Sequence, residues 1–211
     1  MELVKLTVSD FVAVTASDAP APGGGSVSAL VGSLSAALAQ MVANLTVGRE
    51  KYASAQADMG QMLPSLASVQ KELLAAVDAD TRAFDRYMAA LAMPKATEEE
   101  KERRSNAMQE GLKEAALVPL GVAKTAVSLF PHLEKVLTVG NPNAVTDGMV
   151  GTMLTRTCIL GAIFNVRVNL SSIRDEAFVA ELSKECDELQ ALAQKEEQRI
   201  LHQIPLSQIS Y

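Results

Sequence analysis

Asp80 places a carboxylate within a stripe of apolar residues. Between residues 63 and 91, apolar side chains recur at steps of three or four, which on a helix form one core-facing stripe. The stripe comprises Leu63, Leu66, Val69, Leu73, Val77, Asp80, Phe84, Tyr87 and Leu91. A carboxylate in such surroundings is paired, hydrogen-bonded or raised in pKa. A pKa raised towards neutrality suits a general acid/base, whereas a position at the edge of the stripe suits a structural acid.

Asp78 lies two residues before Asp80 and points about 200° away from it around the helix. We therefore expect Asp78 to face solvent, with Arg82, four residues further on, as its surface partner. The two acids would then differ in environment, and only Asp80 would be turned towards the core.

The glycine-rich residues 22–26 form a second candidate for a functional site. Gly23, Gly24 and Gly25 would let the backbone approach a ligand closely, and the N–H groups at a helix start favour anions. The segment is not a P-loop, because it lacks the GK[ST] ending and no strand precedes it. The alternative to a ligand-binding loop is a tight turn that only connects two elements. We expect Ser26 to cap the helix that follows.

A third polar group occupies the turn-rich residues 140–147. Asn143 could cap the next helix, and Asp147 in its first turn would suit the helix dipole. Asp147 also shares a helix face with Asn165, which would instead turn it inward. Asn141 lies beside both in this loop.

Helical periodicity dominates the chain, and no alternating strand pattern persists. Apolar residues make up 48% and aromatic residues only 4%, which favours closely packed helices over a β-sandwich. We predict one all-α domain over residues 1–211, a bundle of long helices. The first helix should begin near Thr7, and another should begin at a capping box at residues 97–100. The other helices should cover residues 26–45, 52–90, 145–170 and 175–201. Pro64 should break or kink the helix over residues 52–90.

Residues 26–45 are apolar on most sides but carry several polar side chains, so we expect a helix buried in protein and no membrane span. Its core stripe should consist of Val27, Leu30, Val31, Leu34, Leu38, Met41, Val42 and Leu45. A helix with so little polar surface also predicts packing against a second copy, and hence a homodimer.

Charge and composition argue against several classes of function. The net charge is −6 and no basic cluster has the density of a nucleic-acid footprint, so no nucleic-acid partner is expected. The only two cysteines, Cys158 and Cys186, suit a reduced, cytoplasmic protein. His132 and His202 stand in no metal-binding motif, and we predict no metal site.

Six motifs in one order resemble the cyclodeaminase/cyclohydrolase family of folate enzymes. They are PAPGGGSVSAL (20–30), MVANLTVGREKY (41–52), VDADTRAFDRYM (77–88), VPLGVA (118–123), GNPNAVTD (140–147) and FNVRVNL (164–170). The family includes the C-terminal domain of formiminotransferase-cyclodeaminase and free-standing bacterial relatives. The resemblance implies a dimer-forming helical fold that acts on a tetrahydrofolate derivative as substrate and needs no other cofactor.

The resemblance also implies roles for individual residues. It assigns the acid/base to Asp80, the glycine loop to Gly23, Gly24, Gly25 and Ser26, and the Asn-rich loop to Asn141, Asn143 and Asp147. Lys51 and Arg167 match basic positions of the free-standing enzymes and would hold the folate carboxylates or the pterin carbonyl. Both loops should meet near Asp80, within one chain or across two.

The activity expected first is that of a formiminotetrahydrofolate cyclodeaminase, which forms 5,10-methenyltetrahydrofolate and releases ammonia. A methenyltetrahydrofolate cyclohydrolase, which opens the same bridge to 10-formyltetrahydrofolate, would use the same pocket and acid/base. The third alternative is a non-catalytic helical scaffold or binding protein, which would have no need for a core-facing carboxylate beside two polar loops.

Overall fold

The computed structural model describes residues 2–204, and every regular element in that range is a helix, as predicted. The α-helices are α1 (Val8–Thr15), α2 (Gly24–Asn44), α3 (Gln56–Leu91), α4 (Glu98–Val127), α5 (Leu129–Val139), α6 (Val145–Leu170) and α7 (Glu176–His202). Short 3₁₀ helices are η1 (Leu3–Lys5), η2 (Glu50–Ala55) and η3 (Pro142–Ala144). Thr7 caps α1 and a Thr97–Glu100 capping box opens α4, both as predicted.

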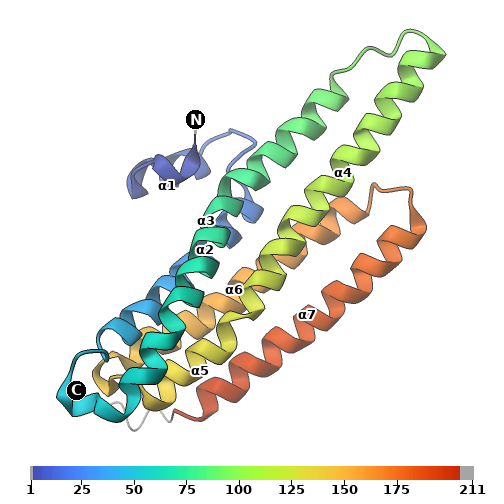
Figure 1. Ribbon diagram of the computed structural model, residues 1–211. Coiled ribbons are helices and arrows are strands. Elements are labelled where there is room, and N and C mark those ends of the chain that lie inside the picture. Colours follow the sequence, from blue (N-terminus) through green and yellow to red (C-terminus); the bar gives the residue numbers. More distant parts are fainter. Residues whose placement is uncertain (1, 205–211) are drawn as a thin grey trace.

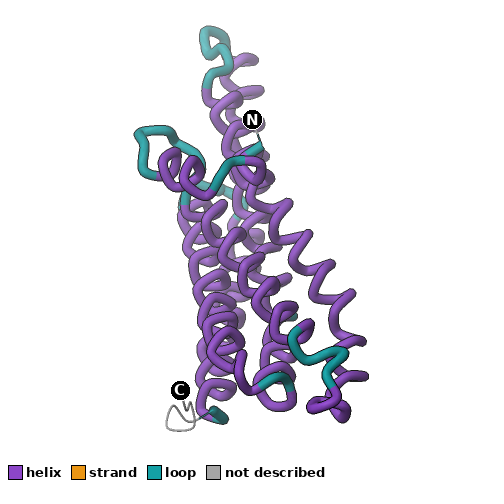
Figure 2. The backbone as a smooth tube through the Cα atoms, turned by 90° about the vertical axis from the view of Figure 1, so that its left-hand side faces the viewer, coloured by secondary structure: helices purple, strands orange, loops and turns teal. Residues whose placement is uncertain are grey.

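Four helices enclose the core. α2 packs against α3 and α6, and α4 packs against the same two helices, so the four close a ring. Figures 1 and 2 show them running lengthwise through the molecule, with α7 along the side of α6 and α5 at the end of the bundle. The upper ends of α3 and α4 project beyond the other helices (Figure 1).

The apolar stripe of α3 faces the core as predicted. Leu66, Leu73 and Val77 are buried, and Asp80 follows them on the same side of the helix. Of the predicted break or kink at Pro64, the break is wrong, because α3 continues through this residue. Met62 and Leu66 on either side of Pro64 are buried, so their packing outweighs the lost backbone hydrogen bond.

The predicted core stripe of α2 is correct in part, since Val42 is buried and Leu30, Val31 and Leu45 pack against the core, but small residues occupy most of the buried side. Ala29, Ala36 and Ala39 are buried, while Leu34 and Met41 are among the exposed apolar residues. The cause is close packing between α3 and α6: a Cβ on Gly32 would lie 2.6 Å from Sγ of Cys158 on α6. The largest exposed side chains of this helix, Leu34 and Met41, lie on its outer side.

Three segments are long and apolar enough to cross a membrane, judged by length and composition alone: Gly24–Asn44, Glu98–Val139 and Pro142–Leu170. About half of the apolar window in each is buried inside the bundle. Packing in the core thus accounts for part of their apolar character. That the protein has no membrane partner remains a prediction.

Asp78 does not face solvent, and the expectation that it pairs with Arg82 at the surface is wrong. Its side chain is 9% exposed, and its Oδ1 accepts a hydrogen bond of 2.6 Å from the backbone N–H of Leu3. The N-terminal η1 lies over this side of α3, and Leu3 is itself buried there. Helical periodicity describes only the helix, so it could not reveal a segment 75 residues away that covers it.

We expect Asp78→Ala to lower the free energy of unfolding by about 1–3 kcal/mol, because the N–H of Leu3 would lose its acceptor in a buried place. Asp78→Asn retains an oxygen acceptor and should cost less. Urea denaturation of both variants measures the difference. An unchanged midpoint in Asp78→Ala would show that η1 is held by other contacts.

Candidate active site

The predicted role of Ser26 as a helix cap is wrong, and its actual place defines the site. α2 begins at Gly24 with Gly23 as its cap residue, so Ser26 lies inside the first turn. The buried Ser26 hydroxyl lies 3.0 Å from the carbonyl oxygen of Val77 and 2.8 Å from Oδ2 of Asp80. Ser26 therefore links the start of α2 to the middle of α3.

The hydroxyl of Ser26 has one proton for two acceptors. When that proton is donated to the carbonyl oxygen of Val77, an ionised Asp80 gains no bond from the hydroxyl. When Asp80 is protonated, its carboxyl can instead donate to Oγ of Ser26, while the Ser26 hydroxyl donates to the carbonyl oxygen of Val77. The carboxyl, the hydroxyl and the carbonyl then each have a hydrogen-bond partner. The hydrogen-bond pattern thus accommodates both protonation states of Asp80.

Burial raises the pKa of the Asp80 carboxyl above its ordinary value. The hydroxyl and the backbone N–H of Ser26 act in the opposite direction, because they stabilise the ionised form, but burial is the larger effect. Asp80 forms no ion pair with any residue in the range 2–204. A half-buried carboxyl without a cationic partner can give and take a proton nearer neutrality.

Gly25 lies directly against this carboxyl. A Cβ at this position would lie 2.2 Å from Oδ1 of Asp80, so the contact requires glycine. Gly24 lies similarly close to the side chain of Asn165, where a Cβ would be 3.1 Å from Nδ2. Two consecutive glycines therefore bring the α2 backbone close to polar side chains from α3 and α6.

The Asp80 carboxyl faces a hollow of about 220 Å³ between the loop before α2 and the helices α3, α4 and α6. The hollow is lined by Pro20, Ala21, Gly23, Gly25, Asp80, Thr81, Phe84, Ala115, Asn165, Val168 and Asn169. Neither Asn165 nor Asn169 was predicted as a site residue. Their spacing of four, which places both on one helix face, was the available signal.

The Asn-rich loop lies at the opposite end of α2. Asn141 donates its backbone N–H to Oγ1 of Thr46 and its Nδ2 to the carbonyl oxygen of Leu45, just beyond the end of α2. Its Oδ1 accepts from the Tyr52 hydroxyl at 2.8 Å and from the backbone N–H of Asn143. A helix of 21 residues is roughly 30 Å long, so these groups do not reach Asp80 in the same chain.

The remaining predicted residues also lie away from the hollow. Lys51 belongs to η2, next to Tyr52 and hence near the Asn-rich loop, and Asp147 lies in the first turn of α6. Arg167 points to α7, where it forms an ion pair of 2.7 Å with Asp187. Within one chain the structure brings the glycine loop to Asp80, but not Lys51, Asp147 or Arg167.

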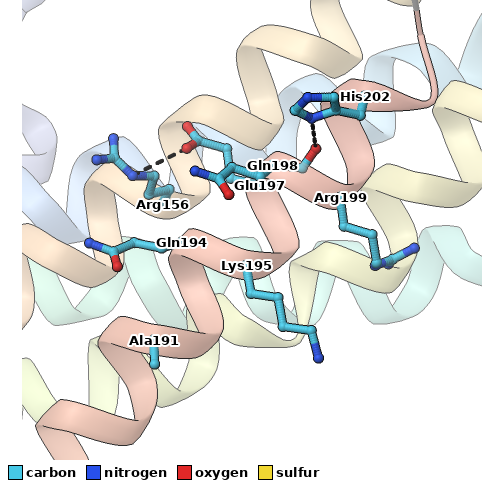
Figure 3. Close-up of a pocket in the computed structure, with 8 residues that line it drawn as sticks. All are labelled: Arg156, Ala191, Gln194, Lys195, Glu197, Gln198, Arg199 and His202. Atoms are coloured by element: carbon cyan, nitrogen blue, oxygen red, sulfur yellow. Dashed lines mark hydrogen bonds and ion pairs between the residues drawn. The ribbon is translucent and has the colours of Figure 1, made fainter.

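A larger hollow of about 710 Å³ lies between α6 and α7 and does not include Asp80. Its lining, drawn in Figure 3, consists of Arg156, Ala191, Gln194, Lys195, Glu197, Gln198, Arg199 and His202. Arg156 pairs with Glu197 at 3.2 Å, and Arg199 holds the pKa of Glu134 at about 2 through hydrogen bonds. Most of its charges thus serve neighbouring side chains, which makes the smaller hollow at Asp80 the better candidate.

The fold and the site together define the class of protein: a helical bundle in which one half-buried carboxyl lines a hollow. Comparison with known proteins identifies the class more closely, since the family described as Formiminotransferase-cyclodeaminase matches residues 7–188. The chain belongs to this family, which confirms the resemblance seen in its motifs.

Named relatives include both fused and free-standing proteins. The chain is 40% identical over 179 residues to Formimidoyltransferase-cyclodeaminase of Sus scrofa, covering 85% of the chain and 33% of that relative. It is 37% identical over 194 residues to Methenyltetrahydrofolate cyclohydrolase of Methylorubrum extorquens, covering 92% of the chain and 93% of the relative. The chain thus spans about a third of the length of the first relative and nearly all of the second.

A solved structure is similar over the whole fold. The crystal structure of formiminotetrahydrofolate cyclodeaminase from Thermotoga maritima matches with a TM-score of 0.83 and 31% sequence identity. The match covers 94% of this chain and 96% of the other.

Proposed function

We propose that the protein is a formiminotetrahydrofolate cyclodeaminase that uses Asp80 as its acid/base. The observation that carries the proposal is the half-buried Asp80 carboxyl, which is hydrogen-bonded to Ser26 and lines a hollow with Asn165. The family membership supports it, because the relatives from Sus scrofa and Thermotoga maritima are named as cyclodeaminases.

In this reaction N10 of the substrate attacks the formimino carbon carried on N5, the ring closes to the methenyl bridge, and ammonia leaves. N10 must lose a proton and the leaving nitrogen must gain one. One carboxyl that is stable in both protonation states meets both needs, and Asp80 has such an environment. General acid/base catalysis of this kind contributes about 10²–10⁴ in rate.

The second candidate is a methenyltetrahydrofolate cyclohydrolase. The Methylorubrum extorquens relative carries that name, and the alignment covers 92% of this chain and 93% of that relative. The same carboxyl would activate water for attack on the methenyl carbon. A non-catalytic scaffold is a weaker alternative, because a scaffold would not need a half-buried carboxyl whose pKa is raised.

Absorbance of the methenyl chromophore distinguishes the candidates. The purified protein is offered 5-formiminotetrahydrofolate and 5,10-methenyltetrahydrofolate in separate assays. Appearance of the chromophore with release of ammonia is the expected result for a cyclodeaminase. Loss of the chromophore faster than the spontaneous rate would identify a cyclohydrolase, and no catalysis of either reaction would favour the scaffold.

We further propose that the protein forms a homodimer through the exposed sides of α2 and α6. These two helices pack side by side, and large apolar residues on their outer sides are between 44% and 65% exposed. The residues are Leu34, Met41, Val150, Met153, Phe164 and Val168. A patch of this kind along two neighbouring helices is typical of an interaction surface.

A dimer of this kind would also account for the two separated groups of predicted site residues. A two-fold axis that crosses α2 and α6 at right angles makes the helices of two copies antiparallel. The Asn141 end of one copy would then lie beside the Asp80 end of the other. We therefore keep Asn141, Asn143, Asp147 and Lys51 as proposed substrate-binding residues, acting on the site of the partner subunit.

We expect the double variant Leu34→Asp, Met153→Asp to sediment as a monomer at micromolar concentration, because two charges would be buried at the proposed interface. Leu192→Asp on α7 is the matched control, since that leucine is exposed away from α2 and α6 and should leave the dimer intact. A wild-type protein that sediments only as a monomer would refute the proposed interface.

A further inference from the structure

Asn165 and Asn169 present two unused oxygen acceptors on the wall of the hollow. Nδ2 of Asn165 donates to the carbonyl oxygen of Gly161 at 2.8 Å. Nδ2 of Asn169 donates to the carbonyl oxygens of Ala115, at 3.0 Å, and Asn165, at 2.8 Å. Carbonyl oxygens can only accept, so these bonds fix which atom of each amide is the nitrogen.

The orientation leaves Oδ1 of each amide free. Among residues 2–204 no donor reaches either oxygen, and neither oxygen is fully enclosed by protein. Oδ1 of Asp80 likewise accepts no side-chain hydrogen bond, since Ser26 is bonded to Oδ2. Three side chains that line the same hollow therefore offer acceptors, and a ligand held there should present donors towards them.

Asn165 and Asp80 border the same part of the hollow. Asn165 lies against Gly24 and Asp80 lies against Gly25, and the Cα atoms of neighbouring residues are about 3.8 Å apart. The hollow, about 220 Å³, is smaller than the roughly 300–1,000 Å³ of complete small-molecule sites. It can therefore enclose a bicyclic ring, while the rest of a larger substrate extends outside.

We propose that Asn165 and Asn169 recognise the donor edge of the reduced pterin ring, its 2-amino group and the adjacent N3–H, through their Oδ1 atoms. This inference rests on the proposed folate substrate and adds a recognition role for two residues of α6. With this edge held by the amides, the ring system is fixed beside the Asp80 carboxyl, which lines the same hollow. The two asparagines would thus be positioning residues for the proton transfer.

Binding measurements with two ligands test the inference without requiring turnover. Calorimetry gives the dissociation constants of 5-formyltetrahydrofolate and of its 2-desamino analogue. We expect the wild-type protein to bind the analogue about tenfold more weakly, the value of one lost hydrogen bond in an enclosed site. In the double variant Asn165→Ala, Asn169→Ala the two ligands should bind within about twofold of each other, because the partner of the amino group is gone.

Controls separate this role from a structural one. Asn106→Ala, on the exposed side of α4, should discriminate between the ligands as the wild type does. If loss of the Ala115 contact unfolds the double variant, Asn165→Ala alone still tests the inference, since its side-chain nitrogen bonds only within α6.

The possible results separate this inference from the proposed function. Tight binding of both ligands with equal affinity to the wild type would overturn the inference and leave the proposed function standing. Full discrimination in the folded Asn165→Ala, Asn169→Ala variant would do the same. Failure of the wild type to bind 5-formyltetrahydrofolate at all would instead overturn the proposed function, and the inference with it.

Discussion

Asp80→Asn should lower turnover by about 10²–10⁴ while substrate still binds. Asparagine keeps the size of the side chain and an oxygen for the Ser26 hydroxyl, but it cannot exchange a proton. The loss should therefore appear in kcat, with a small change in KM. Steady-state kinetics on the active substrate measure both.

The same variant should be as stable as the wild type at neutral pH, or more stable. Burial raises the pKa of Asp80 in the folded state, so over the range between its unfolded and folded pKa the folded state binds more protons. The free energy of unfolding then falls as pH rises through that range. Asp80→Asn removes this dependence, and urea denaturation at several pH values would show a flatter profile.

Asp85→Asn is the matched control for this prediction. Asp85 lies on the same helix and is exposed, so the same substitution should change turnover little. Asp78 cannot serve as a solvent-facing control, because it holds Leu3. Near-normal turnover in Asp80→Asn, or an equal loss in Asp85→Asn, would mean that the proton transfer belongs to another residue.

The fold class and the core-facing position of Asp80 could be predicted from the sequence, because both depend on short-range periodicity. Steps of three and four residues define which side of α3 is buried, and Leu66, Leu73 and Val77 lie there as expected. The same reasoning was wrong for Asp78, because the covering segment comes from the N-terminus. It was wrong for Leu34 as well, because apolar character alone does not tell a core side chain from an exposed one.

The composition of the hollow depends on packing between helices that are distant in sequence. Ser26 was expected at a cap because serine is common there, but α2 starts two residues earlier and turns Ser26 towards α3. The spacing of four from Asn165 gives the helix face of Asn169, but no local pattern reveals its bond to the carbonyl oxygen of Ala115 on α4. The resemblance pointed to the loop around Gly25, and only the structure shows which atoms that glycine approaches.

The two predicted loops illustrate a further limit. Sequence order and resemblance suggested that the glycine loop and the Asn-rich loop act together, yet α2 separates them by its full length in one chain. Whether they cooperate depends on a second subunit, whose position is not encoded in the periodicity of any single helix. The exposed apolar sides of α2 and α6 are what favour that arrangement.

Among substitutions that add a single methyl group near the site, Gly25→Ala should lower activity the most. Its Cβ would lie 2.2 Å from Oδ1 of Asp80, so the carboxyl or the first turn of α2 must move by more than 1 Å to restore ordinary contact. A displacement of about 1 Å from productive geometry can cost about 10²-fold in rate. We therefore expect kcat/KM to fall by at least about 10², with about 1–3 kcal/mol of stability lost to overpacking.

Gly121→Ala on α4 is the matched control for Gly25→Ala. No atom would lie within 4 Å of its Cβ, and the residue is exposed, so this variant should keep its activity and gain a few tenths to about 1 kcal/mol of stability. Denaturation and kinetics on both variants separate the two effects. A folded Gly25→Ala protein with full activity would show that Asp80 can leave its bond to Ser26 without loss, and the acid/base assignment would then lose its geometric basis.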